Sequence, residues 1–214
     1  MAMKLYNYFR SSASFRVRIA LNLKGLSYEY IPIHLAKGEH LLEAFAPLSA
    51  DRLLPVLETE GLRLSQSLAI CEYLDEVYPE PKLLPGDASA RAQVRALSQM
   101  VACEIHPLNN LRVLKHLTGP MGQSESAKIE WIHHWIHTGF KALETLLTER
   151  GAKQFCWGDQ PTLADACLVP QVFNAQRFEV SLDAYPTIRR IHEHCMSLDA
   201  FDQAQPSRCP DAAA

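Results

Sequence analysis

The chain has 214 residues, of which 48% are hydrophobic and 21% are charged, an ordinary globular composition with room for two domains. Its formal net charge is −3, so no strong global field would recruit nucleic acid or an anionic membrane surface. No segment approaches the roughly 18 apolar residues of a membrane-spanning helix, and the first residues lack the apolar run of a signal peptide. The six cysteines are scattered without a Cys-x-x-Cys pair, which is typical of buried free thiols in a reducing compartment. We therefore expect a cytoplasmic protein.

The first part of the chain mixes strand-like and helix-like patterns. Short runs rich in β-formers predict strands at residues 4–8, 28–33, 56–59 and 62–64. Apolar residues at helical spacing predict helices at residues 15–24, 40–45 and 66–78. Glu60-Gly61 lies between the last two strands and indicates a hairpin. The order βαβ followed by ββα predicts a thioredoxin-like α/β domain over residues 1–81.

The rest of the chain shows only helical patterns. Residues 79–87 contain three prolines and a glycine, which predicts a linker between domains. Helices are then expected at residues 94–114 with a kink at Pro107, at 126–150, from Thr162 onward, and at 187–198. The tail from residue 206 to residue 214 is expected to be loose. The sequence therefore predicts a second domain, an all-α helical bundle over residues 88–214.

A serine-rich turn, Ser11-Ser12-Ala13-Ser14, lies between the first strand and the first helix. A helix N-terminus offers unpaired N–H groups and a positive dipole end, and serine hydroxyls there donate to a bound anion. A thiolate held in this place would have a lowered pKa. The alternative is that the serines only cap the helix, although three serines exceed what one cap needs. A serine nucleophile is disfavoured because the G-x-S-x-G elbow is absent, and a redox turn is disfavoured because position 13 is alanine.

Two residue pairs later in the first domain suit a peptide ligand. Pro55 marks a strand start or edge, and in the cis form it would leave the backbone of Leu54 facing a ligand, although a plain loop proline is commoner. Gln66 and Ser67 open a helix, where they either cap the helix or offer donors to a carboxylate.

Two motifs of the helical part are interpreted as structural. His133 and His137 stand four residues apart with His134 between them, but the zincin glutamate and a clear third ligand are missing. We therefore expect a solvated helix face and no metal. The Thr162-x-x-Asp165 motif predicts a capping box, for which we expect no catalytic role.

Together these motifs resemble the zeta-class glutathione transferases, and among them the maleylacetoacetate and maleylpyruvate isomerase group. The resemblance covers nearly the whole chain and is carried by Ser-Ser-x-Ser-[aromatic]-Arg-Val-Arg-Ile-Ala-Leu at 11–21, Pro55, Gln66-Ser67-Leu68-Ala69-Ile70 and Thr162-Leu163-Ala164-Asp165. It implies the glutathione transferase architecture, with a glutathione-binding domain, a helical substrate-binding domain and a homodimeric assembly.

The resemblance implies glutathione as the cofactor and assigns a role to each matching position. The hydroxyls near the sulfur are those of Ser11 and Ser12, which with Arg10 form the implied catalytic set. The remaining cofactor contacts of the first domain are implied at Ala13, Ser14, Phe15, Arg16, His40 for the glycyl end, Leu54 and Pro55 for the cysteinyl part, and Gln66 and Ser67 for the γ-glutamyl part. The helical domain is expected to close over the cofactor with His106, Asn110, Leu111 and Arg112. Substrate carboxylates are expected to meet Arg10, Arg112 and Arg177.

The chain departs from the family pattern at two positions. The family usually carries cysteine where this chain has Ala13, so a cysteine-dependent side reaction should be absent. Leu53 replaces a residue that is polar in relatives, which puts one glutathione contact in question.

The implied activity is glutathione-dependent cis–trans isomerisation of a maleyl-type keto acid. The sulfur adds to an alkene carbon, the resulting single bond rotates, and the sulfur leaves, while arginines neutralise the carboxylates and the developing enolate. Two alternatives stay open: a glutathione transferase or dehalogenase acting on small α-halo acids, and a non-catalytic glutathione-fold binding module. The intact Ser11, Ser12, Gln66 and Ser67 disfavour the binding module. The sequence separates neither maleylacetoacetate from maleylpyruvate nor Ser11 from Ser12 as the thiolate contact.

Overall fold

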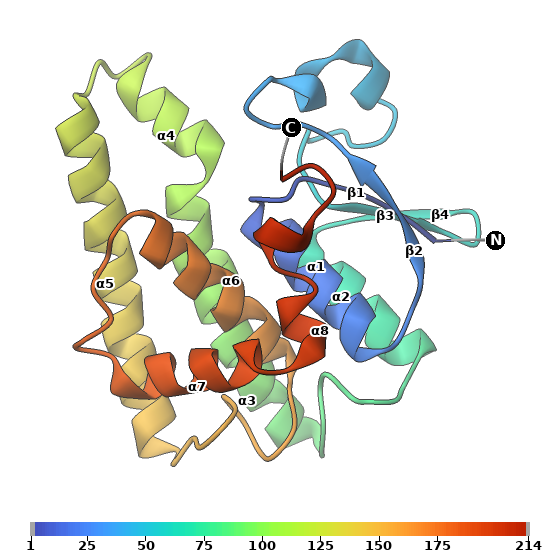
Figure 1. The fold of residues 1–214 in the computed structure, drawn as a ribbon, viewed down its shortest axis with the longest axis vertical. Coiled ribbons are helices and arrows are strands. Elements are labelled where there is room, and N and C mark those ends of the chain that lie inside the picture. Colours follow the sequence, from blue (N-terminus) through green and yellow to red (C-terminus); the bar gives the residue numbers. More distant parts are fainter. Residues whose placement is uncertain (1–2, 213–214) are drawn as a thin grey trace. The chain divides into compact units, whose positions relative to one another are not determined.

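The computed structural model describes residues 3–212, which divide into two compact units. One unit runs to Leu84 and also includes the chain from Met196 onward, and the other spans Pro85–Cys195. Figure 1 shows their elements in chain order. No helix within residues 3–212 is long and apolar enough to cross a membrane.

The first unit is built on a four-stranded sheet in the order β2-β1-β3-β4. Its strands are β1 Met3–Asn7, β2 Tyr28–Pro32, β3 Val56–Thr59 and β4 Leu62–Ser65. β1 is parallel to β2 and antiparallel to β3, and β4 is antiparallel to β3. The positive φ angles of Glu60 (48°) and Gly61 (81°) form the two-residue turn that joins β3 to β4. The predicted strands and hairpin are therefore confirmed.

Two helices pack side by side in this unit, α1 Ser12–Leu23 and α2 Ser67–Val77 (Figure 1). Gly25 ends α1 because its φ of 63° lets the Leu26 amide turn back and bond the Leu21 carbonyl at 2.9 Å. The side chains of Phe15, Ile19 and Leu57 are buried between the helices and the sheet. The thioredoxin-like βαβ-ββα order predicted from the sequence is the observed one.

The segment before β3 and the linker after α2 are irregular but held in place. Residues 40–45, expected to form one short helix, form two separate 3₁₀ turns, Glu39–Leu41 and Glu43–Phe45. In the linker, the Asp75 carboxylate accepts hydrogen bonds from the amides of Leu83 and Leu84. The buried Lys24 ammonium also bonds Asp75, at 2.9 Å. The linker is therefore tied to the first unit.

The end of the chain corrects the sequence prediction in two ways. The sequence predicts a helical domain up to residue 214, but the structure groups residues 196–212 with the unit that contains the sheet. The tail from residue 206, expected to be loose, forms a 3₁₀ turn at Pro206–Arg208 and then buries Cys209 and Asp211. The short helix α8 Asp199–Asp202 before it contacts α1 and buries Phe201 completely. Burial of these side chains explains why a segment without a strong local pattern is ordered.

The second unit contains only helices among its described residues: α3 Ala88–Gln99, α4 Leu111–Thr118, α5 Glu125–Glu149, α6 Leu163–Arg177 and α7 Pro186–Met196, of which the last residue falls in the first unit. α3 packs against α6, and α4 against α5 (Figure 1). The core of this unit is made of buried aliphatic residues and Phe140 from α3, α5, α6 and α7. The predicted all-helical character of this part of the chain is confirmed.

The helix predicted with a kink at Pro107 is interrupted instead. A π-helical turn, Met100–Ile105, follows α3, and a 3₁₀ turn, His106–Asn109, leads to α4. Pro107 lacks the amide that an α-helix needs, and the extended Asn110 (φ −67°, ψ 145°) separates the 3₁₀ turn from α4. α5 approaches the π-helical turn so closely that a Cβ on Gly139 would lie 2.3 Å from Ile105. Only glycine fits there without displacement.

Candidate functional site

Ser11 caps α1 and keeps a donor for a ligand. It has extended backbone angles (φ −72°, ψ 116°), and its Oγ accepts a hydrogen bond from the Ser14 amide at 3.2 Å. The capping interpretation is therefore correct for Ser11. Its hydroxyl proton is not used by this bond, because the oxygen acts as the acceptor. The half-buried Ser11 can cap the helix and donate to a bound anion at the same time.

The other residues of the turn differ in their access to solvent. Ser12 is buried at the first position of α1, and Ser14 is fully buried, with an Oγ that has no partner among the described residues. Ala13 is half-buried, and within residues 3–212 its amide bonds no other group. Phe15 is a core residue at 1% exposure, so its side chain serves packing. The groups at this helix N-terminus that reach the surface are those of Ser11 and Ala13.

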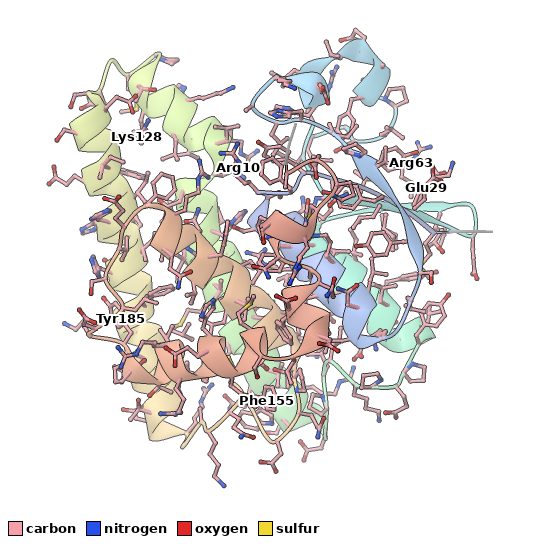
Figure 2. The ribbon with its side chains drawn as sticks, in the orientation of Figure 1. Arg10, Glu29, Arg63, Lys128, Phe155 and Tyr185 are labelled. Atoms are coloured by element: carbon pink, nitrogen blue, oxygen red, sulfur yellow. The ribbon has the colours of Figure 1, made fainter. Side chains whose placement is uncertain are left out.

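Arg10 precedes the turn and is exposed. Figure 2 labels Arg10, whose guanidinium carbon lies 4.7 Å from the centroid of the Phe9 ring. This cation–π contact orients the Arg10 side chain and leaves its charge exposed to solvent. Arg10 therefore offers a solvent-accessible cation next to Ser11.

Arg16 joins the starts of the two helices. It is 2% exposed, and its Nη1 donates to the Ser67 Oγ at 3.1 Å. Within residues 3–212, its Nε and Nη2 have no hydrogen-bond partner, so no described carboxylate neutralises its charge through them. A buried cation without a counter-charge is costly, so this position favours the approach of an anionic ligand.

Gln66 and Ser67 begin α2 with an unusual backbone. Gln66 has φ 68°, a left-handed conformation that is uncommon for a residue with a Cβ. Its side chain does not cap the helix and instead donates from Nε2 to the Asp51 Oδ2 at 3.2 Å. The other oxygen of Asp51 accepts from Ser49 Oγ and the Leu53 amide. Ser49 and Asp51 were not predicted from the sequence, because no local pattern connects them to Gln66.

The Leu54–Pro55 peptide bond is cis, as the family resemblance implied. Within residues 3–212, the amide and carbonyl of Leu54 bond no other group, so both are available to pair with an extended ligand. His40 lies half-buried in the first 3₁₀ turn, and Arg52 holds the end of that turn by donating to the carbonyls of Leu41 and Leu42 at 2.7 Å.

The remaining predicted residues belong to the helical unit. His106 begins the 3₁₀ turn, and Asn110 caps α4 by accepting from the Arg112 amide at 3.1 Å. Leu111 and Arg112 are exposed. Arg177 is the last residue of α6, exposed, with its guanidinium carbon 5.0 Å from the Phe178 ring centroid. Four of these five residues thus share one short segment, and Arg177 lies on a different helix.

The histidines of α5 make structural contacts. His133 Nε2 lies 2.7 Å from the Phe178 carbonyl, and His137 Nδ1 lies 2.8 Å from the hydroxyl of Tyr185, which Figure 2 labels. The expectation of a simply solvated face is therefore wrong for these two residues. Within residues 3–212 no group of three or more potential ligands could hold a metal ion.

The capping box of α6 is confirmed and lies in the core. The Asp165 Oδ2 accepts from the amide and the hydroxyl of Thr162, each at 2.8 Å, and Oδ1 accepts from the Cys156 amide at 2.7 Å. Burial raises the pKa of Asp165, while these donors oppose the rise. Burial also raises the pKa of the Cys156 and Cys195 thiols beside it, so both stay protonated. The cluster has a structural role and no thiolate.

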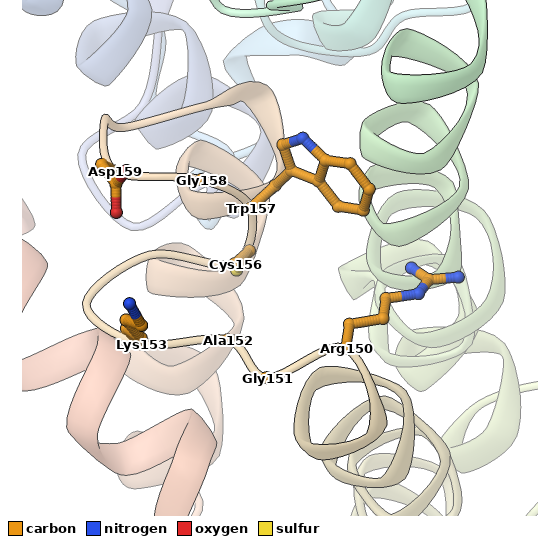
Figure 3. A pocket seen from close by; sticks show the side chains of 8 residues that line it. All are labelled: Arg150, Gly151, Ala152, Lys153, Cys156, Trp157, Gly158 and Asp159. Atoms are coloured by element: carbon orange, nitrogen blue, oxygen red, sulfur yellow. The ribbon is translucent and has the colours of Figure 1, made fainter.

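Two pockets elsewhere contain no predicted site residue. One, of about 380 Å³, lies at the loop after α5 and is lined by Arg150, Gly151, Ala152, Lys153, Cys156, Trp157, Gly158 and Asp159. Figure 3 shows that the Arg150 side chain points away from those of Lys153 and Asp159. The other, of about 650 Å³, lies at the C-terminal end of α1 beside α8, away from the serine turn. Neither presents a cluster of donors like that of the helix starts.

Comparison with known proteins agrees with this geometry. Residues 1–76 match the family model of the glutathione S-transferase N-terminal domain, and residues 137–199 match that of the C-terminal domain. A maleylpyruvate isomerase from Ralstonia sp is 51% identical over 214 residues, which cover 99% of this chain and 100% of that protein.

Two solved structures extend the match to three dimensions. The holo structure of a maleylpyruvate isomerase, described as a bacterial zeta-class glutathione S-transferase, has a TM-score of 0.95 and 50% identity over 97% of this chain and 99% of its own. A maleylacetoacetate isomerase from Anaeromyxobacter dehalogenans 2CP-1, with dicarboxyethyl glutathione and citrate bound in its active site, has a TM-score of 0.87 and 44% identity over 99% and 94%. The chain therefore belongs to the zeta class of the glutathione S-transferases, in the group of the maleylpyruvate and maleylacetoacetate isomerases.

Proposed function

We propose that this protein isomerises a maleyl-type keto acid to its trans form with glutathione as the cofactor. The observation that carries the proposal is the pair of donor-rich helix starts that Arg16 joins through its 3.1 Å bond to Ser67. The α1 start suits a thiolate, and the α2 start suits a carboxylate. One tripeptide with a thiol and a carboxylate at its γ-glutamyl end matches both.

The residues present fit glutathione at three points. The Ser11 hydroxyl and the free Ala13 amide suit its sulfur. The free peptide groups of Leu54 suit the cysteinyl backbone. Ser67, whose oxygen already accepts from Arg16, has its own proton left to donate to the γ-glutamyl carboxylate. The unpaired charge of Arg16 behind Ser67 would be compensated by that carboxylate.

Bound glutathione would supply the nucleophilic sulfur that adds to the cis double bond and leaves after rotation. Ser11 would hold this sulfur as a thiolate by donating its hydroxyl proton, aided by the positive end of α1. The exposed Arg10 would bind a substrate carboxylate and stabilise the negative charge that develops on the conjugated carbonyl. Ala13 leaves no competing thiol in the turn.

The helical unit would complete the site. His106, Asn110, Leu111 and Arg112 would close over glutathione, and Arg112 and Arg177 would add cations for a dianionic substrate. Relatives support an acidic substrate, since one binds a dicarboxyethyl adduct of glutathione together with citrate.

The proposal is tested by giving the purified protein maleylpyruvate or maleylacetoacetate, with and without glutathione. Proton NMR follows the conversion, because cis and trans alkene protons have different couplings. Glutathione-dependent formation of the fumaryl product from either compound is expected, and the faster one identifies the substrate. Absence of isomerisation with both compounds contradicts the proposal.

Two further measurements decide between the alternatives. Release of chloride from α-chloro acids, without isomerisation, would identify a transferase or dehalogenase instead. If millimolar glutathione fails to raise the melting temperature, the protein does not bind this cofactor and a non-catalytic role is favoured.

The proposal includes a homodimer in the cytoplasm, by analogy with the family. Light scattering of the purified protein measures its mass in solution against the 24.1 kDa of one chain. A monomeric mass would contradict this part of the proposal without affecting the isomerase assay.

A further inference from the structure

The C-terminal segment, residues 196–212, contacts the backbone just before the serine turn. Its Asp211 is 7% exposed, and Oδ2 accepts a hydrogen bond from the Phe9 amide at 3.1 Å. The other carboxylate oxygen accepts from the hydroxyl of Tyr30 on β2. Phe9 is separated from Ser11 only by Arg10, so Asp211 holds the chain where it enters the turn.

A buried arginine holds the same peptide from the other side. Arg18 on α1 is 1% exposed, and its Nη2 donates to the Phe9 carbonyl at 3.0 Å. Its Nε donates to the Ala204 carbonyl of the C-terminal segment at 2.8 Å, and its Nη1 to the Asn7 side chain at 3.0 Å. Both peptide groups of Phe9 are therefore fixed, one by the C-terminal segment and one by an arginine that also binds that segment.

The same segment supports the strand that carries Leu54. Cys209 is packed into a cluster with Phe9, Leu54 and Val56, and Ala212 contacts this cluster. The residues behind the serine turn and behind the Leu54–Pro55 strand start thus share one small core, which the C-terminal segment completes. Such packing transmits a displacement of the segment to both positions, because protein interiors are close-packed.

We propose that the C-terminal segment is a positioning element of the thiolate site, and that Asp211 is its positioning residue. By fixing the Phe9 amide, Asp211 sets the direction of the Ser11 hydroxyl and the place of Arg10. This inference rests on the proposed function for the identity of the thiolate. Asparagine in this place would keep one acceptor oxygen and present an NH2 donor instead of the other, so the Phe9 amide and the Tyr30 hydroxyl would no longer each have their own buried acceptor, and the turn would loosen.

The experiment measures the pKa of the thiol of bound glutathione by ultraviolet absorption of the thiolate across pH. In Asp211→Asn the pKa of the glutathione thiol is expected to rise by about one unit. This rise lowers the thiolate fraction about tenfold at pH values below the wild-type pKa. kcat is expected to fall by the same factor at pH values below the wild-type pKa and to recover as pH rises. KM for glutathione should change less than about threefold, since Gln66 and Ser67, which would hold the γ-glutamyl end, lie outside the cluster that the segment completes. Asp211→Glu keeps a carboxylate, so it should raise the thiol pKa less than Asp211→Asn does.

Two controls exclude a general loss of structure. Arg208→Ala breaks the exposed ion pair with Asp202 in the same segment and should leave the thiol pKa unchanged. If Asp211→Asn does not fold, Tyr30→Phe removes one donor to Asp211 and should raise the thiol pKa in the same direction by a smaller amount. Tyr28→Phe, the same change two residues earlier on β2, is its matched control and should have no effect.

An unchanged thiol pKa in Asp211→Asn, with only a lower melting temperature, would overturn the inference and leave Asp211 a merely structural residue. The same conclusion follows if Tyr30→Phe and Tyr28→Phe behave alike. The titration needs only glutathione binding, so it stays informative if the wild-type protein isomerises neither keto acid. Failure of the proposed function and failure of this inference are therefore distinguishable.

Discussion

Replacing Ser11 by glycine and by alanine separates its two roles, because the two changes remove the same hydroxyl but affect the helix differently. The Ser11 oxygen accepts from the Ser14 amide at 3.2 Å and caps α1. Both variants lose this bond and the hydroxyl proton that Ser11 would donate to the sulfur of glutathione. Glycine is itself a tolerated N-cap, whereas alanine is not.

The expected magnitudes follow from this geometry. Loss of the cap costs about 1 kcal/mol in Ser11→Ala but only a few tenths in Ser11→Gly, and in a chain of this size about 1 kcal/mol lowers Tm by roughly 2–4 °C. A hydrogen bond to a charged group contributes about 1.5–3 kcal/mol. At about 1.4 kcal/mol per pKa unit, both variants should raise the pKa of bound glutathione by about one to two units.

The assay combines three measurements on wild type, Ser11→Gly, Ser11→Ala and Ser12→Ala. Thermal unfolding gives stability, ultraviolet titration gives the thiol pKa of bound glutathione, and isomerase turnover is followed across pH. We expect turnover at pH values below the wild-type thiol pKa to fall about 10- to 100-fold in both Ser11 variants, in proportion to the lost thiolate. Among these variants, only Ser11→Ala should have a Tm clearly below that of the wild type. Ser12→Ala should leave the cap intact, because Ser12 does not accept the capping bond.

Full turnover and an unchanged thiol pKa in Ser11→Gly would refute the role of Ser11, and a loss confined to Ser12→Ala would transfer it to the buried neighbour. Turnover that falls only in step with stability would mean that the serines serve as caps alone.

Three other predictions test the site and the core. Arg16→Met should weaken glutathione binding about tenfold or more by calorimetry, yet cost the free protein little stability, because two guanidinium nitrogens of Arg16 have no partner among the described residues; unchanged affinity contradicts this. Asp165→Ala should lower the free energy of unfolding in urea by about 3 kcal/mol or more, because it leaves buried donors unpaired. The control Asp159→Ala, at an exposed position, should change it little, and equal effects of the two variants would be inconsistent with a buried capping box. Burial lowers the pKa of His192 in the folded protein. The unfolded chain therefore protonates His192 more readily, and the free energy of unfolding falls as pH drops below the ordinary pKa of histidine. His192→Gln should show a smaller loss between neutral and mildly acid pH, and parallel curves would count against this assignment.

The sequence alone determined the features that depend on neighbouring residues. Serine at a helix start, Gly25 at a helix end and Glu60-Gly61 between two strands act through local backbone geometry, so their patterns predicted the elements correctly. The thioredoxin-like order followed from the succession of these elements. The resemblance of residues 11–21 to a known family then predicted that glutathione binds at the serine turn.

Local sequence patterns did not predict the interruption after α3 or the two 3₁₀ turns of residues 39–45. A helical stripe from Val94 to Leu114 looks the same whether the helix bends or changes to π and 3₁₀ turns. Pro107 and the extended Asn110 decide between these forms only together with packing, as the close approach of Gly139 to Ile105 shows.

Only the tertiary structure decided how distant residues meet at the site. Arg16 and Ser67 are 51 positions apart, and Phe9 and Asp211 are 202 positions apart, yet each pair is hydrogen-bonded. No periodicity or local propensity encodes such contacts, because they form when whole elements pack and bury their apolar faces. The tail that looked loose by composition is ordered for the same reason, since Phe201, Cys209 and Asp211 find their partners only in the folded first unit.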